Sequence, residues 1–153
     1  MRAQMKLGAF LMPTGHHIAA WRHPDAAADM GLDVQHYIRL AQTAEKAGFD
    51  LLFLEDAAGL RDENARTASQ TSRSIGFEPL SLLAAIAAHT SRIGLVATAS
   101  TSYNEPYALA RAFATLDLLS NGRAGWNLVT SASEIEAANF GAEGLRKHVD
   151  RYH

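Results

Sequence analysis

The chain has 153 residues, of which 48% are hydrophobic and 20% charged, which is enough for one globular domain with a hydrophobic core. Its formal net charge of -2 excludes the basic surface typical of nucleic-acid-binding domains, and the absence of cysteine excludes disulfides and thiolate chemistry. No apolar run approaches the roughly 20 residues of a membrane-spanning helix, and the first residues show no signal-peptide pattern. We therefore expect a cytoplasmic protein that binds neither nucleic acid nor a membrane.

Short apolar runs alternate with longer amphipathic runs along the first half of the chain. Residues 6–11 predict a strand, which a loop rich in proline and glycine follows. Asp33 suits the N-cap of a helix over residues 34–48, because apolar side chains recur there at helical spacing and a glycine ends the pattern. Residues 49–56, FDLLFLED, predict a buried strand.

The second half of the chain opens with a polar segment and then resumes the alternation. Residues 61–76 predict a long loop, either at the surface or beside an active site. Pro79 suits the first turn of the next helix, and Asn121 followed by Gly122 suits the end of the helix after that. The sequence predicts helices over residues 78–91, 105–122, 133–141 and 144–153, and strands over residues 92–100 and 123–130.

Four strand–helix units in succession imply parallel strands joined by helical crossovers. A doubly wound sheet and a (β/α)8 barrel both fit that order. No GxGxxG follows the first strand, and small residues inside the later strands (Gly94, Ala97 and Gly125) favour the tight interior of a barrel. We therefore predict an α/β fold of the (β/α)8 TIM-barrel type. A complete barrel takes about 250 residues, so this chain would supply about the first four units, either as a truncated piece or by assembly of two copies.

Polar residues occur where the predicted strands end, and barrel enzymes place their active sites at that edge. Side chains alternate between the two faces of a strand, so either Glu55 or Asp56 lies at the barrel mouth after the second strand. Thr98 lies near the end of the third strand, on the face that it shares with Gly94 and Val96. These positions are candidates for contact with a ligand.

The fourth predicted strand carries an asparagine among apolar residues. Alternation puts Asn127 on the same face as Gly125, whereas Trp126 and Leu128 suit the face that packs against helices. A buried amide without a partner costs about 1–3 kcal/mol, so Asn127 needs one. Two interpretations stay open: it bonds a neighbouring strand or a water, or it faces a flat ligand in the space beside the glycine.

The remaining polar candidates are individually weaker. His148 and Tyr152 lie four residues apart, so a helix would present them on one face, although the spacing alone favours a solvated surface. Arg123 could bind an anionic group at the start of a strand. The others are histidines without zinc spacing, serines without a GxSxG turn and glutamates that suit a solvated helix start, namely His16, His17, His23, His36, Ser131, Ser133, Glu134 and Glu136. We predict no metal site.

Several stretches together resemble one enzyme family. GRAGWNLVTS at residues 122–131, followed by AANFG and then by His148 and an Arg-Tyr pair, resembles the flavin-dependent monooxygenases of the bacterial-luciferase-like family. AEKAGFDLLFLED at residues 44–56 and LDLLSNGRAGWN at residues 116–127 support it. The chain is most similar to the branch of nitrilotriacetate and dibenzothiophene-sulfone monooxygenases, whose N-terminal half it would match throughout.

The resemblance implies a TIM-barrel monooxygenase that uses reduced FMN, delivered by a separate flavin reductase, and dioxygen to oxygenate a small organic substrate. It names no catalytic side chain. Matched positions imply that five residues contact the flavin: Asp56, Thr98, Asn127, His148 and Tyr152. For His148 and Tyr152 this replaces the interpretation as a solvated helix surface. Glu55 departs from the family, which usually has a small residue there.

Family chains are much longer, so we expect residues 1–153 to be the N-terminal part of a single flavin-monooxygenase barrel domain that is truncated or forms a homo-oligomer. Two other hypotheses stay open. One is a non-catalytic, truncated remnant of such an enzyme, and the other is a different α/β barrel enzyme that binds a phosphorylated ligand.

Overall fold

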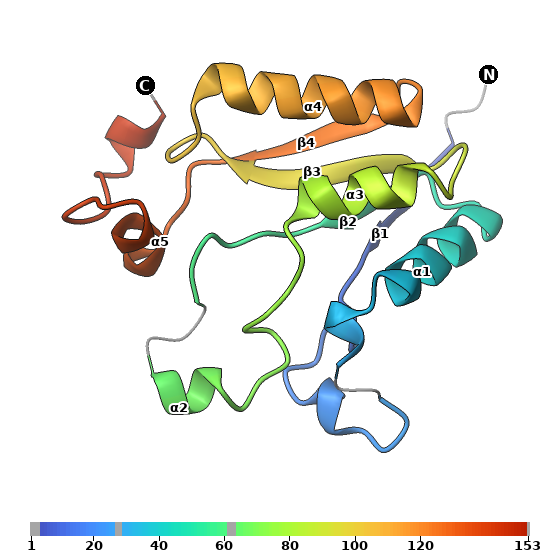
Figure 1. The fold of residues 1–153 in the computed structure, drawn as a ribbon, viewed down its shortest axis with the longest axis horizontal. Helices are drawn as coiled ribbons and strands as arrows, with labels where there is room; N and C mark the ends of the chain where they lie inside the picture. The colour runs from blue at the N-terminus through green and yellow to red at the C-terminus, as the bar shows by residue number, and fades with distance from the viewer. Residues whose placement is uncertain (1–3, 27–28, 61–63, 153) are drawn as a thin grey trace.

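One sheet of four parallel strands organises the chain, and the strands lie side by side in sequence order. The computed structural model describes residues 4–26, 29–60 and 64–152 (Figure 1). The strands are β1 (Gly8–Phe10), β2 (Leu51–Leu54), β3 (Gly94–Ser100) and β4 (Ala124–Val129). Each of them lies within a segment that the sequence predicted to be a strand, so the parallel α/β arrangement is confirmed.

Three helices connect the strands and cover the same face of the sheet (Figure 1). They are the crossovers that parallel strands require, and each packs against the strand that follows it or against its neighbouring helix. These three helices are α1 (Val34–Lys46), α3 (Pro79–Ala87) and α4 (Pro106–Ser120). Two shorter helices, α2 (Ala65–Ala68) and α5 (Glu134–Asn139), and 3₁₀ turns at Ala20–Arg22, Met30–Leu32 and Val149–Arg151 lie in the connecting segments.

The predicted helix boundaries are set by local hydrogen bonds. The Asp33 carboxylate accepts from the N–H of Gln35 at 2.8 Å and begins α1. Pro79 is the first residue of α3. At the end of α4, Asn121 and Gly122 both adopt positive φ angles, of 58° and 82°, which reverse the chain into β4.

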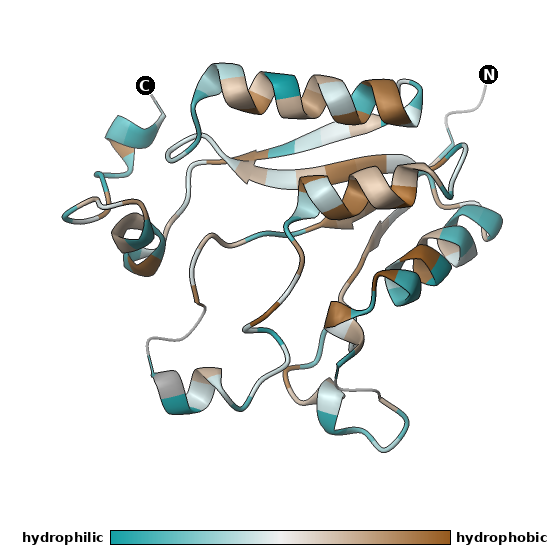
Figure 2. Ribbon diagram, in the orientation of Figure 1, coloured by the Kyte–Doolittle hydropathy of each residue, from teal (hydrophilic) through white to brown (hydrophobic). Residues whose placement is uncertain are grey.

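The hydrophobic core lies between the sheet and its three covering helices. Its centre is fully buried and comes from two strands and one helix, as Leu52, Leu95, Leu83 and Ile86 show. Figure 2 shows hydrophobic residues along α3 and along β3 behind it. Burial of such aliphatic side chains contributes roughly 1.5–3 kcal/mol each, so this layer stabilises the strand order on which the site depends.

The opposite face of the sheet, which we call the inner face, is only partly covered. Phe10 and Phe53 are register partners on it, with ring centroids 4.8 Å apart, and Phe10 is 39% exposed. Val96 pairs with Phe53 in the next strand and is half-buried. This face is the side of the sheet that forms the interior of a (β/α)8 barrel.

Two predictions about local structure were wrong. Residues 144–153 do not form a helix within the described range, because only the turn Val149–Arg151 is helical there. The segment is mostly exposed and has no apolar stripe to bury, and the Leu145 N–H is bonded to Glu134 instead of to a helical carbonyl, at 2.8 Å. The predicted loop 61–76 contains the helix α2 within its described part.

A carboxylate near the end of α1 holds the connection between α3 and β3. Glu45 accepts hydrogen bonds from the N–H groups of Ser91, Arg92 and Ile93, at 2.9, 2.9 and 3.1 Å. Partial burial would raise the pKa of Glu45, but these three backbone bonds outweigh it and lower the pKa from 4.5 to about 2. The start of β3 is therefore anchored by a group that has to stay ionised.

Replacement of Glu45 by glutamine should make the free energy of unfolding less sensitive to acid. Because the folded pKa is the lower one, the stabilisation by Glu45 is fully present above pH 4.5 and is lost as the pH falls toward 2. Urea unfolding across that range should show a steeper loss for the unaltered chain than for Glu45→Gln. The exposed Glu143→Gln variant should keep the steep profile, and parallel profiles for Glu45→Gln and the unaltered chain would contradict the assignment.

Candidate functional site

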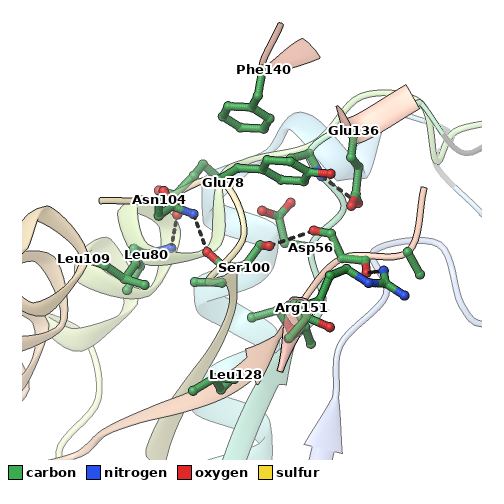
Figure 3. A pocket seen from close by; sticks show the side chains of 18 of the residues that line it. Asp56, Glu78, Leu80, Ser100, Asn104, Leu109, Leu128, Glu136, Phe140 and Arg151 are labelled. Atoms are coloured by element: carbon green, nitrogen blue, oxygen red, sulfur yellow. Dashed lines mark hydrogen bonds between the residues drawn. The ribbon is translucent and has the colours of Figure 1, made fainter. Parts of the chain in front are cut away.

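A cavity of about 710 Å³ lies at the carboxyl edge of β3 and β4, beside the loop after β2. We call it the edge cavity. Figure 3 shows it surrounded by side chains from several elements that are far apart in the sequence. Its polar lining includes Asp56, Thr98, Ser100, Tyr103, Glu136, His148, Arg151 and Tyr152. Four of the five residues predicted to contact flavin line this one cavity.

Asp56 lies two residues beyond the end of β2 and is exposed at the cavity rim. It also lines a second cavity of about 460 Å³, formed by the loop after β1 and the segment around Arg73. Of these two cavities, Glu55 lines only the second. Of the two carboxylates predicted at the mouth, Asp56 is therefore the one that lies between both cavities.

Thr98 and Asn127 are register partners on the inner face of neighbouring strands. The Asn127 Nδ2 donates to Thr98 Oγ1 at 3.0 Å, and Thr98 is 5% exposed. Asn127 thus bonds a neighbouring strand, which was one of the two open interpretations. An amide has two donors and an acceptor, so this bond leaves it further capacity. Asn127 is not among the residues that line the edge cavity, but its partner Thr98 is.

The space expected beside Asn127 is filled. A Cβ atom at Gly125 would lie 2.9 Å from Val96 Cγ2, which is closer than van der Waals contact permits. Gly125 therefore allows β3 and β4 to approach at this point, and it does not open a slot for a flat ligand. On the other face Trp126 packs on Phe113 of α4 as predicted, with ring centroids 5.2 Å apart, whereas Leu128 is 55% exposed.

His148 and Tyr152 come together although the predicted helix does not form. Their ring centroids are 4.9 Å apart, and both rings line the edge cavity. The 3₁₀ turn Val149–Arg151 places them on the same side. This turn is tied to the end of β4, because the Arg151 guanidinium donates to the carbonyl of Ser131, whose φ angle is 58°.

Arg123 is a structural residue, and its predicted capacity to bind an anion is wrong. Its guanidinium nitrogens donate to five oxygens at 2.6–3.2 Å, four of them backbone carbonyls of Ala87, Thr90, Ile93 and Ser120. These bonds join the ends of α3 and α4 to the start of β3. All five N–H donors of the guanidinium are used in these bonds, so none is left for a ligand.

The other weak candidates also make local bonds. Ser131 Oγ bonds Ser100 Oγ at 2.7 Å, and Ser133 caps α5 by accepting from the N–H of Ile135. His16 and His36 each contact a backbone carbonyl near β1. Within residues 4–26, 29–60 and 64–152, no three histidine, aspartate or glutamate side chains are placed to hold a metal ion, and no helix there is long and apolar enough to cross a membrane.

Two features of the cavity wall were not predicted. Glu136, expected to be solvated, is 7% exposed and accepts from the Ala58 N–H at 3.2 Å. Tyr103 and Phe140 stack with centroids 4.6 Å apart and planes 3° from parallel. Burial, and then the charge of Glu136, raise the pKa of Tyr103. These contacts join the segments after β2, β3 and β4, so no periodic signal in the sequence marks them.

The luciferase-like monooxygenase family model matches residues 5–153, almost the whole chain. The chain belongs to this family. The predicted family and its barrel-type α/β fold, here about four β/α units, are thereby confirmed.

Two curated relatives show the strength of the sequence match. N-acetyl-S-(2-succino)cysteine monooxygenase of Bacillus subtilis is 50% identical over 151 residues, which cover 99% of this chain and 33% of that protein. Component A of nitrilotriacetate monooxygenase of Aminobacter aminovorans is 45% identical over 158 residues, which cover 97% of this chain and 34% of the relative. The chain therefore spans about a third of the length of these relatives.

Solved structures agree with the sequence match. EDTA monooxygenase from Chelativorans sp. BNC1 superposes with a TM-score of 0.88 at 36% identity, covering 98% of this chain and 35% of that one. Riboflavin lyase, solved with a modified FMN and riboflavin, gives a TM-score of 0.85 at 35% identity, with the same coverage of both chains. At least one structural relative thus binds a flavin.

Replacement of Thr98 by valine should destabilise the fold, because the side chain keeps its shape but no longer accepts from Asn127. We expect a loss of about 1–2 kcal/mol in the free energy of unfolding, measured in urea. The control is Thr101→Val, since Thr101 is exposed and its hydroxyl only contacts a carbonyl at 3.3 Å. Equal effects of the two substitutions would show that the bond between Thr98 and Asn127 contributes nothing.

Proposed function

We propose that this chain forms the flavin-binding part of a two-component monooxygenase. Such an enzyme takes reduced FMN from a separate flavin reductase and uses dioxygen to oxygenate a small organic substrate. The observation that carries the proposal is the convergence of Asp56, Thr98, His148 and Tyr152 on one cavity, with Asn127 bonded to Thr98. Membership of a monooxygenase family supports the reaction type.

The cavity fits a flavin in size and in chemistry. Its volume of about 710 Å³ lies within the roughly 300–1,000 Å³ typical of small-molecule sites. An isoalloxazine ring has apolar faces and an edge of hydrogen-bond donors and acceptors. The cavity offers the matching surfaces, since Leu80, Leu109 and Leu128 line it together with hydroxyl, imidazole and carboxylate groups.

Reduced FMN, when bound, supplies the electrons that activate dioxygen for transfer of one oxygen atom to a substrate. The residues of this chain hold and shield that chemistry. His148 offers two ring nitrogens and Tyr152 a hydroxyl for hydrogen bonds to the ligand. The buried Leu109 and the partly buried Leu80 reduce the access of water, which protects reactive intermediates in a site of this kind.

We also propose that the inner face of the sheet becomes the interior of a complete barrel in the functional enzyme. Phe10 lies on that face and is 39% exposed, and Phe53 and Val96 lie on it and are only partly buried. They would be covered by further strands, either of a longer chain that resembles the relatives or of a second copy in a homo-oligomer. In this arrangement residues 5–153 form the N-terminal part of the barrel domain.

Substitution of His148 by alanine should weaken FMN binding about tenfold, because it removes a hydrogen-bonding group that we place at the ligand, and Asn127→Ala should weaken binding by removing the bond that positions Thr98 in the cavity wall. Flavin fluorescence during titration measures the dissociation constant. His89→Ala is a suitable control, since His89 is exposed beyond the end of α3 and does not line the edge cavity. Unchanged affinity in both site variants would contradict the residue assignments.

A further inference from the structure

Glu136 is the most unusual polar residue in the wall of the edge cavity. It lies in the first turn of α5, lines the cavity and is 7% exposed. In the described part of the chain its Oε2 atom is buried and has no hydrogen-bond partner. Buried carboxylate oxygens are normally paired, so a lone one in a cavity wall indicates a site for a donor that belongs to a ligand.

The position of that oxygen is fixed by the other half of the same carboxylate. Glu136 Oε1 accepts from the Ala58 N–H at 3.2 Å, and Asn139 of the same helix donates to the Ala58 carbonyl at 2.8 Å. The contact is close, because a Cβ atom at Gly59 would lie 3.0 Å from the Glu136 backbone nitrogen. The loop after β2 thus clamps the glutamate and leaves Oε2 as the free acceptor.

The surroundings of Glu136 are those of a ligand site. Figure 3 shows the side chains of Glu136 and Asp56 together among those that line the cavity. Arg151, on the same cavity, has a buried Nε that also lacks a partner within the described residues. Tyr103, whose pKa the charge of Glu136 helps to raise, completes the wall with a flat ring.

We propose that Glu136 is a ligand-contacting residue whose Oε2 accepts a hydrogen bond from an N–H or O–H group of the flavin in the edge cavity. This inference rests on the proposed function, because it takes flavin as the occupant. An ionised carboxylate only accepts hydrogen bonds, so it recognises donors. A flavin offers two kinds, the ring N–H and the hydroxyls of the ribityl chain.

The test is Glu136→Gln in the full 153-residue chain, with FMN titrated and followed by flavin fluorescence. Glutamine keeps an oxygen for the Ala58 N–H but replaces the second acceptor with a donor, so FMN affinity should fall tenfold or more. Asn139→Ala is the matched control, since it removes only the bond to the Ala58 carbonyl and does not line this cavity. The control should change affinity less than twofold.

Titration with riboflavin and with lumichrome, which lacks the ribityl chain, distinguishes the two donors. Weaker lumichrome binding by Glu136→Gln would identify the ring N–H, and a loss seen only with riboflavin and FMN would identify a hydroxyl. In the unaltered chain, the ¹³C resonance of the Glu136 carboxyl carbon should shift when FMN is added. This second measurement does not depend on the folding of any variant.

Three outcomes would overturn the inference. Equal FMN affinity of Glu136→Gln and the unaltered chain, with an unmoved carboxyl resonance, would overturn it alone. An equal loss in Asn139→Ala would assign the effect to docking of the loop on α5 and not to ligand contact. Failure of the unaltered chain to bind any of the three flavins would overturn this inference together with the proposed function.

Discussion

The parallel register of the four strands is the constraint on which the candidate site depends. It directs all carboxyl ends to one edge, so loops that are distant in sequence meet there. Two charged residues at the opposite edge hold this register. Glu45 binds three backbone N–H groups at the start of β3, and Arg123 binds the carbonyls around it. Because both side chains bond backbone groups, they stabilise the sheet. The candidate ligand site lies at the other edge.

The cavity wall is built by the docking of α5 on the loop after β2. Glu136 and Asn139 bind the two backbone groups of Ala58, and the absent side chain of Gly59 lets the backbones approach. This contact divides the space at the carboxyl edge into two cavities, with Asp56 lining both. The second cavity therefore adjoins the edge cavity at Asp56.

Strand alternation was enough to place Thr98 and Asn127 on one face, because a period of two residues is a local property of the chain. The role of Glu136 could not be predicted in this way, since its burial depends on a loop 78 residues earlier. The prediction that Arg123 binds an anion was wrong for the same reason, because its partners lie on other elements. The helix predicted over residues 144–153 had good local spacing but no face to bury, and packing decides such segments.

The proposed function requires that this part of the chain carries a formed flavin site. The most direct measurement is an anaerobic titration of the unaltered 153-residue chain with reduced FMN, followed by its tryptophan fluorescence. If the site is formed, quenching should saturate at micromolar FMN. Quenching that grows linearly with FMN and never saturates would show that no formed flavin site is present.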